Sequence, residues 1–194
     1  GVFFLSVGLV WLLVRPAEKL GWVDHPHTRK HHLHPVPVVG GFAMWGAFLV
    51  GVLLLPVKAS DTPIMLTGMT LLTLVGGYDD RRHVRPGLRF VLQGVAVAVM
   101  GVADNCQLIH LGDLFGLGQI DMGWAAMWFT LFAVIGVINA FNMMDGLDGL
   151  AGGLALTVTG WLLILCLAAP VAVQGKVGTL LVLAMAIAGF LLFN

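Results

Sequence analysis

The sequence predicts an all-α, multi-pass membrane protein, and three observations lead to that fold class. Of its 194 residues, 59% are hydrophobic and only 10% are charged, whereas soluble domains carry about 25% charged residues. The apolar residues gather in runs close to the roughly 20 residues that cross a bilayer as a helix. The charged residues lie between these runs, apart from Arg89 at the start of the fourth. A formal net charge of zero gives no electrostatic reason to expect a nucleic-acid partner.

We expect about seven transmembrane helices, one for each apolar run. They cover Gly1–Val14, Val38–Val57, Pro63–Tyr78, Leu88–Ala103, Trp124–Ala140, Leu150–Pro170 and Val177–Phe193. The third and fourth runs are short, so either their helices extend into the flanking loops or the bilayer thins around them. Because the chain opens and closes inside apolar runs, we expect residues 1–194 to be a single integral membrane domain truncated at both ends.

Basic residues divide the predicted loops into two alternating sets. Arg15–Pro37 contains four Lys or Arg residues and Asp79–Gly87 contains three, while Asp104–Gly123 contains none. The positive-inside rule therefore places the first two loops, and by alternation Phe141–Gly149, in the cytoplasm. On the opposite side, the glycines and alternating apolar residues of Asp104–Gly123 predict a small periplasmic hairpin, and its acidic residues are interpreted as solvated turn residues.

The stretch Ile138–Leu150 concentrates amides and carboxylates within an apolar sequence. Asn139, Asn142, Asp145 and Asp148 recur at every third position. In a helix such residues share one face, although two glycines in the stretch weaken the case for a regular helix. Oxygen-rich side chains of this kind suit Mg²⁺ and phosphate chemistry. Helix capping is the competing interpretation, and it accounts for one Asp-Gly pair but not for all four residues.

Two further loops carry unusual polar residues. Asp79 and Asp80 directly follow an apolar run, and adjacent carboxylates repel unless a cation or a metal lies with them. Ion pairs with the arginines downstream are one explanation, and a metal–phosphate site is the other. In the first loop, Arg29 and Lys30 offer cations for a phosphate, or they simply anchor the loop in the cytoplasm. The five histidines of that loop lack the spacing of a zinc site.

Taken together, the three loops resemble the polyprenyl-phosphate N-acetylhexosamine-1-phosphate transferase superfamily. The resemblance is closest to its bacterial undecaprenyl-phosphate N-acetylglucosamine-1-phosphate transferase branch, within glycosyltransferase family 4. The residues that carry it are Val23-Asp24-x-Pro26-x-x-Arg29-Lys30-x-His32-x-x-Pro35-Val36-Pro37-x-x-Gly40-Gly41, Gly77-Tyr78-Asp79-Asp80-Arg81 with Arg89, and Asn139-Ala140-Phe141-Asn142-Met143-Met144-Asp145-Gly146-Leu147-Asp148-Gly149. Related phospho-MurNAc-pentapeptide transferases carry an Asn-Leu-Thr-Asp-Gly third loop, which this chain replaces with Asn-Met-Met-Asp-Gly.

The resemblance implies a reaction and a role for each matched residue. UDP-GlcNAc and undecaprenyl phosphate give undecaprenyl-diphospho-GlcNAc and UMP, the first membrane step of a cell-surface polysaccharide such as O-antigen, with Mg²⁺ or with Mn²⁺ in its place. Asp79 and Asp80 are implied to be the catalytic pair that orients or deprotonates the lipid phosphate. Asn142 is implied to bind the metal, with a second ligand expected beyond Asn194. Substrate binding is implied for Arg29, Lys30, His32, Arg89, Asn139, Asp145 and Asp148.

The resemblance also implies a multi-pass protein of the bacterial inner membrane whose active site faces the cytoplasm. Its implied partners are UDP-GlcNAc, undecaprenyl phosphate and the lipid bilayer, and a homodimer is left open. The family continues past the point where this chain stops, with another metal-binding Asp and a His-rich loop. We therefore expect the 194-residue piece to be inactive alone, and UMP release by the purified piece would contradict this.

Two alternatives stay open beside this interpretation. The first is the same chemistry with another UDP-N-acetylhexosamine, because the sequence does not fix the sugar. The second is a membrane transporter, in which acids near the middle of the spans carry ions. Asp79, Asp80, Asp145 and Asp148 all lie at span ends, which favours an enzyme.

Overall fold

The computed structural model describes residues 1–24, 36–37, 39–55, 62–82, 84–103, 107–116, 118–144, 148–169 and 175–193. Over these residues the chain is helical, as predicted. The α-helices are α1 (Val2–Lys19), α2 (Gly40–Leu54), α3 (Thr62–Arg82), α4 (Pro86–Ala103), α5 (Ala126–Met144), α6 (Leu150–Ala168) and α8 (Val177–Phe190). The short elements are the 3₁₀ turn η1 (Gly123–Ala125) and the antiparallel strands β1 (Val23–Asp24) and β2 (Val36–Pro37). Each predicted apolar run therefore coincides with one α-helix.

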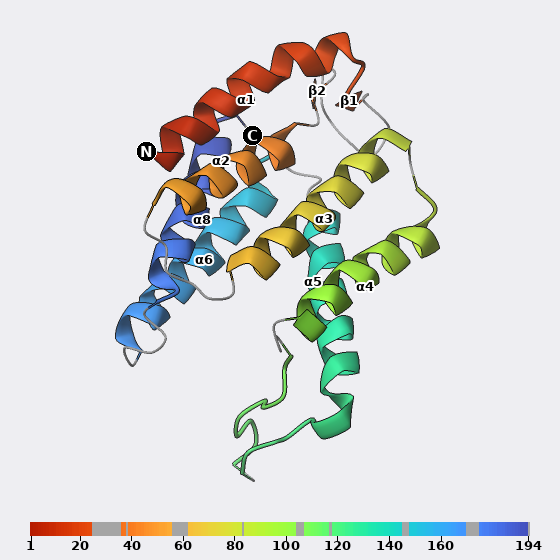
Figure 1. The fold of residues 1–194 in the computed structure, drawn as a ribbon, viewed down its shortest axis with the longest axis vertical. Helices are drawn as coiled ribbons and strands as arrows, with labels where there is room; N and C mark the ends of the chain where they lie inside the picture. Colours follow the sequence, from red (N-terminus) through yellow and green to blue (C-terminus); the bar gives the residue numbers. More distant parts are fainter. Residues whose placement is uncertain are drawn as a thin grey trace.

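The helices pack as a bundle that is continued sideways by α3, α4 and α5 (Figure 1). Helix α8 contacts α1, α2 and α6, and from α2 the contacts pass successively to α3, α4 and α5. The buried core lies between α2 and α8 and consists of Ala47, Phe48, Val52, Val182 and Ala186. The small core residues of α8 allow neighbouring helices to approach it closely.

Helix α1 lies against α8 at a very short distance. The buried Ser6 hydroxyl donates a hydrogen bond to the Ala186 carbonyl at 2.8 Å. One turn further along α8, a Cβ atom added at Gly189 would lie 2.6 Å from the Phe3 carbonyl oxygen. Because real Cβ atoms do not approach a backbone oxygen this closely, glycine at this position is what permits the contact between the two helices.

The outer surface of the bundle is apolar. Phe132 on α5 is 78% exposed, and Trp161 and Leu165 on α6 are 63% and 61% exposed. Residues Gly123–Met144 and Leu150–Ala168 are long and apolar enough to cross a membrane. Helices α2, α4 and α8 are apolar but shorter. Because exposed apolar area costs about 25 cal/mol per Å² in water, this surface suits hydrocarbon. Two spans are supported in this way, and the arrangement with seven spans stays a prediction.

Four helices extend beyond the apolar runs that predicted them: α1 continues to Lys19, α5 continues to Met144, and α3 and α4 each extend into the segment that joins them. Helix α3 continues through Arg82, so Asp79 and Asp80 lie in its last turns and not in a loop. Arg81 and Arg82 stabilise that extension because cations interact favourably with the C-terminal end of a helix dipole. Helix α4 begins at Pro86, a favourable residue for a first helical position. The helix of the short third run therefore extends into its flanking residues, as the first of the two explanations for the short runs requires.

The segment between α4 and α5 extends away from the bundle, at the opposite end from the α3–α4 turn (Figure 1). A single antiparallel bridge joins His110 to Asp121. The N–H of Met122 donates to the Ile109 carbonyl at 2.8 Å. The side chains of His110 and Asp121 also pair, so Asp121 is more than a solvated turn residue. The placement of this segment in the periplasm stays a prediction.

Candidate active site

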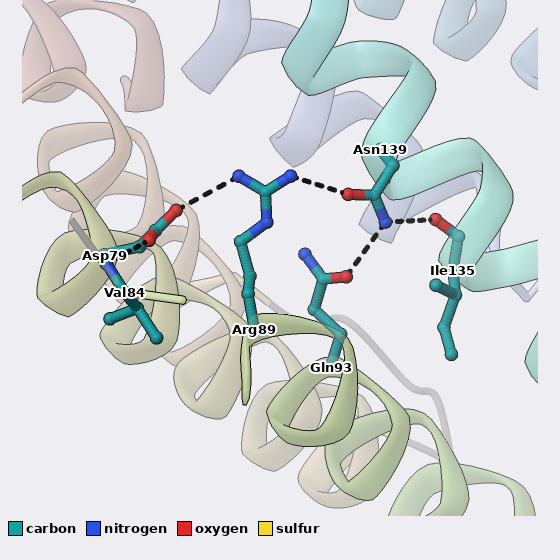
Figure 2. A network of polar contacts seen from close by, with 6 residues as sticks. All are labelled: Asp79, Val84, Arg89, Gln93, Ile135 and Asn139. Atoms are coloured by element: carbon teal, nitrogen blue, oxygen red, sulfur yellow. Dashed lines mark hydrogen bonds and ion pairs between the residues drawn. The ribbon is translucent and has the colours of Figure 1, made fainter. Parts of the chain in front are cut away.

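A chain of polar contacts links the ends of α3, α4 and α5 (Figure 2). Asp79 comes from the last turns of α3, Arg89 from the first turn of α4, and Asn139 from the C-terminal half of α5. These residues belong to two of the three loops that the sequence analysis singled out. The structure therefore brings together residues separated by 10 and by 50 positions in the sequence.

Arg89 is the centre of this network. Its Nη1 donates to Asp79 Oδ2 at 3.2 Å, and its Nη2 donates to Asn139 Oδ1 at 2.9 Å. The side chains of Arg89 and Asp79 are 26% and 20% exposed. The second oxygen of Asp79, Oδ1, accepts from the Val84 N–H at 3.0 Å. Both oxygens of Asp79 are thus hydrogen-bonded, and this carboxylate holds the guanidinium in place.

Asn139 is fixed by hydrogen bonds at both ends of its amide. Its Nδ2 donates to Gln93 Oε1 at 3.0 Å and to the Ile135 carbonyl at 2.8 Å. Its Oδ1 accepts from Arg89. An amide nitrogen only donates and an amide oxygen only accepts. Nδ2 therefore faces the oxygens of Gln93 and Ile135, and this leaves Oδ1 facing the Arg89 guanidinium.

Asn142 lies one helical turn further along α5 and reaches the same guanidinium. With its amide oxygen turned toward Arg89, this oxygen accepts from Nη1 at 2.8 Å and from Nη2 at 3.2 Å. Asn139 and Asn142 therefore share one face of α5, as expected for residues three positions apart in a helix. The helical part of the motif ends at Met144, and Gly149 precedes α6 with a positive φ of 74°.

The remaining predicted site residues divide into two groups. Asp80 and Asp148 are both exposed. Asp80 immediately follows Asp79 but lies on a different face of α3, because successive helical residues are rotated by about 100°. The predicted residues that lie outside the described part of the chain are Arg29, Lys30, His32 and Asp145.

Residues near the first loop form a second feature at the same end of α3. The rings of Trp22 and Phe42 stack with their centroids 5.3 Å apart, and the Arg81 guanidinium lies 5.8 Å from the Trp22 ring centroid. A cavity of about 350 Å³ opens beside them. Its lining consists of Trp22, Phe42, Leu74, Gly77, Tyr78, Arg81 and Arg82. These contacts connect the segment after α1 and the first turn of α2 to the C-terminal end of α3.

The described residues do not by themselves form a metal site. Within them, no three His, Cys, Asp or Glu side chains lie close enough to hold an ion. The oxygens of Asp79 and Asn142 accept hydrogen bonds from Arg89, and a cation at those oxygens would meet the positive guanidinium. Mg²⁺ needs a nearly octahedral set of oxygen ligands. The donor set of the described residues does not fit that requirement.

Gln93 is the residue of this network that the sequence analysis missed. Its side chain is only 6% exposed, and it lies within the apolar run Leu88–Ala103. A buried amide is costly unless it is hydrogen-bonded, so a lone Gln within a predicted span was itself a signal. A buried Gln of this kind predicts a polar partner on a neighbouring helix, and in the structure that partner is Asn139.

The network can perform one kind of chemistry well. A guanidinium held between a carboxylate and two amides keeps its position and its positive charge. Such a group neutralises phosphate oxygens and binds them in a fixed direction. Arg89 Nε is buried and makes no hydrogen bond with the described residues, so the terminal nitrogens carry the polar contacts. The arrangement is suited to phosphoryl transfer, in which positioning and charge neutralisation dominate.

Comparisons with known proteins also indicate a transferase. The family described as glycosyl transferase family 4 matches residues 62–194, which include every residue of the network. The chain is similar to the undecaprenyl-phosphate alpha-N-acetylglucosaminyl 1-phosphate transferase of Pasteurella multocida (strain Pm70). The two are 38% identical over 123 residues, which are 63% of this chain and 34% of that protein.

Proteins of the same name from two other bacteria give similar values. The Salmonella typhi protein is 36% identical over 133 residues, covering 69% of this chain and 36% of that protein. The Haemophilus influenzae protein is 36% identical over 135 residues, covering 69% of this chain and 38% of that protein. The chain therefore spans about a third of the length of the curated relatives that it matches.

Proposed function

Because the chain belongs to glycosyl transferase family 4, we propose that its native protein transfers N-acetylglucosamine 1-phosphate from UDP-GlcNAc to undecaprenyl phosphate. The products are undecaprenyl-diphospho-GlcNAc and UMP. The observation that carries the proposal is the Asp79–Arg89–Asn139 network, a fixed cationic site at one end of an apolar bundle. The names of the relatives indicate the acceptor and the transferred group.

The proposed reaction is a displacement at phosphorus. An oxygen of the lipid phosphate attacks the β-phosphorus of UDP-GlcNAc, and the bond from that phosphorus to the oxygen bridging it to the UMP moiety breaks. UMP leaves with the electron pair of that bond. A phosphate monoester has a second pKa of about 6, so the nucleophile is largely ionised at neutral pH and needs no strong base. The task of the protein is to bring the phosphates together and neutralise their charge.

In this scheme the two aspartates act differently. Asp79 hydrogen-bonds to Arg89 and to the Val84 N–H, so it holds the cation that binds phosphate. Asp80 is exposed on the neighbouring face of α3 and is the carboxylate that contacts the lipid phosphate and accepts its remaining proton. Arg89, with Asn139 behind it, binds the diphosphate of the sugar nucleotide by exchanging its contacts with the exposed Asn142 for phosphate oxygens.

The requirement for Mg²⁺ is a separate proposal. Its support is chemical, because metal ions neutralise charge on transferring phosphoryl groups. Asn142 is the ligand that the resemblance implies, but its oxygen faces the Arg89 guanidinium, so an ion bound here would need its ligands from outside the described residues. Removal of the metal with a chelator should abolish UMP release, and Mg²⁺ or Mn²⁺ should restore it.

We also propose that the protein lies in a bacterial inner membrane and that its site faces the cytoplasm, because UDP-sugars are made in the cytoplasm.

The test is an assay of UMP release by the native protein that contains this sequence, embedded in lipid with undecaprenyl phosphate. A panel of UDP-N-acetylhexosamines identifies the donor sugar. Asp80→Asn should lower turnover by about 100-fold or more, the usual range for loss of a catalytic proton-transfer group. Asp79→Asn should lower turnover by about 100-fold as well, because it disturbs the position of Arg89, whose charge stabilises the transferring phosphoryl group. Asp113→Asn, at an exposed carboxylate in the segment between α4 and α5, is the matched control. Near-normal rates in both site variants would remove the catalytic assignment.

A further inference from the structure

Gln93 lies one turn after Arg89 on α4 and is 6% exposed. Like Arg89, it is a side chain of α4 that hydrogen-bonds to α5, and its Oε1 accepts from Asn139 Nδ2 at 3.0 Å. An amide buried among apolar residues is stabilised only through such contacts. The burial of Gln93 is therefore explained by Asn139, and the question is what the contact does for the site.

The contact determines the orientation of the Asn139 amide. In the observed orientation, Nδ2 faces two acceptors, Gln93 Oε1 and the Ile135 carbonyl, and Oδ1 faces the Arg89 guanidinium. Rotation of the amide by 180° would place its oxygen against both acceptors. The same rotation would direct its N–H groups at a cation that can only donate. The flipped orientation is thus opposed on both sides (Figure 2).

The orientation of Asn139 in turn positions Arg89. The guanidinium is held from one side by Asp79 at 3.2 Å and from the other by Asn139 at 2.9 Å. If the Asn139 oxygen is free to turn away, Nη2 loses its acceptor at 2.9 Å, and the guanidinium is held on the α5 side by Asn142 alone. A cation held by Asp79, Asn139 and Asn142 has less freedom to turn than one that has lost a partner, so it binds a phosphate in a better defined direction.

We propose that Gln93 is a positioning residue of the active site, acting through Asn139 to fix the direction in which Arg89 meets the diphosphate. This inference rests on the proposed function, because the step that it serves is the binding and transfer of a sugar phosphate. Gln93 touches no substrate in this account, and its effect passes entirely through the amide of Asn139.

Three variants of the native protein separate this role from a merely structural one. Gln93→Met keeps the length of the side chain and removes the acceptor. Gln93→Glu keeps an oxygen toward Asn139, whether or not the carboxyl is ionised. Thr159→Val on α6 is the control, because it removes an equally buried polar group whose hydroxyl, within the described residues, donates to the Ala155 carbonyl of its own helix.

We expect Gln93→Met to lower kcat/KM for UDP-GlcNAc by about tenfold, which corresponds to about 1.4 kcal/mol. Most of the loss should fall on kcat, because misdirection of the cation weakens the transition state more than the ground state. Gln93→Glu should recover activity to within about threefold of wild type. The unfolding temperatures of Gln93→Met and Thr159→Val should agree, and Thr159→Val should keep wild-type kinetics.

A double variant tests whether the effect passes through Asn139. In an Asn139→Leu background, the change Gln93→Met should have no further effect on kcat/KM, since the amide that it orients is gone. Additive losses would overturn the proposal. It would also be overturned by wild-type kinetics in Gln93→Met, or by equal losses in the Met and Glu variants. Absence of UMP release from the wild-type protein would instead overturn the proposed function, and this inference with it.

Discussion

Replacement of Arg89 by lysine keeps a positive charge at the site but not its geometry. The two terminal nitrogens of Arg89 donate to Asp79 at 3.2 Å, to Asn139 at 2.9 Å, and to Asn142 at 2.8 and 3.2 Å. Asp79 and Asn139 lie on opposite sides of the guanidinium (Figure 2). A lysine has a single nitrogen at the end of its side chain, so it can reach the partners on one side only.

The size of the effect follows from these contacts. A hydrogen bond to a charged group contributes about 1.5–3 kcal/mol, and the lower value applies here because the Arg89 side chain is 26% exposed. Loss of the contacts on one side therefore costs about 1.5 kcal/mol of positioning, which lowers kcat/KM about tenfold. Arg89→Met also removes the charge and leaves the Asp79 carboxylate without its cation, so it should lower kcat/KM by about 100-fold or more.

The assay is UMP release by the native protein in lipid, with kcat/KM determined for UDP-GlcNAc. Arg15→Lys is the matched control, because the Arg15 guanidinium lies 5.7 Å from the Trp11 ring centroid on its own helix and a lysine can keep that cation–π contact. The reasoning is refuted if Arg89→Lys retains at least half of the wild-type kcat/KM. It is also refuted if the lysine and methionine variants lose equal activity, since charge and geometry would then not be separable.

Two glycine substitutions test the packing that positions the site. Alanine at Gly189 would place its Cβ 2.6 Å from the Phe3 backbone oxygen. The steric cost of about 1–3 kcal/mol exceeds the roughly 1 kcal/mol that alanine gains in a helix, so the unfolding temperature in detergent should fall. Alanine at Gly77 would meet the Phe42 ring at 2.3 Å and should displace that ring, with a change in tryptophan fluorescence as the readout. Gly76→Ala, which meets nothing within 4 Å, is the control: it should leave the fluorescence unchanged and should not lower the unfolding temperature, because alanine is the better helix former.

The sequence predicted the positions of the helices well because apolar runs of this length have few alternative structures. It predicted their ends less well. Asp79 was assigned to a loop because it is charged, yet α3 continues through Arg82, since a helix end is determined by capping and charge as much as by hydropathy. In the same way, Asn142 lies within α5, which continues past Ala140 to Met144.

The partners within the site could not be predicted from the sequence. A spacing of three residues places Asn139 and Asn142 on one face of a helix, but it does not say which neighbouring helix that face meets. The contact of Asn139 with Arg89 and Gln93 depends on how α4 packs against α5. That packing is decided by interhelical fit, which local sequence periodicity does not encode.

The clearest example is the pair Asp79 and Asp80, which the sequence presents as one acidic unit. On a helix, neighbouring residues point about 100° apart, and α3 turns Asp79 toward Arg89 while it leaves Asp80 exposed. An amide at position 79 would direct N–H groups at Arg89 Nη1 or give up the Val84 contact, so Asp79→Asn acts through the position of the cation. Asp80→Asn removes a carboxylate from the open face. Equal losses of turnover in the two variants would thus have different physical causes.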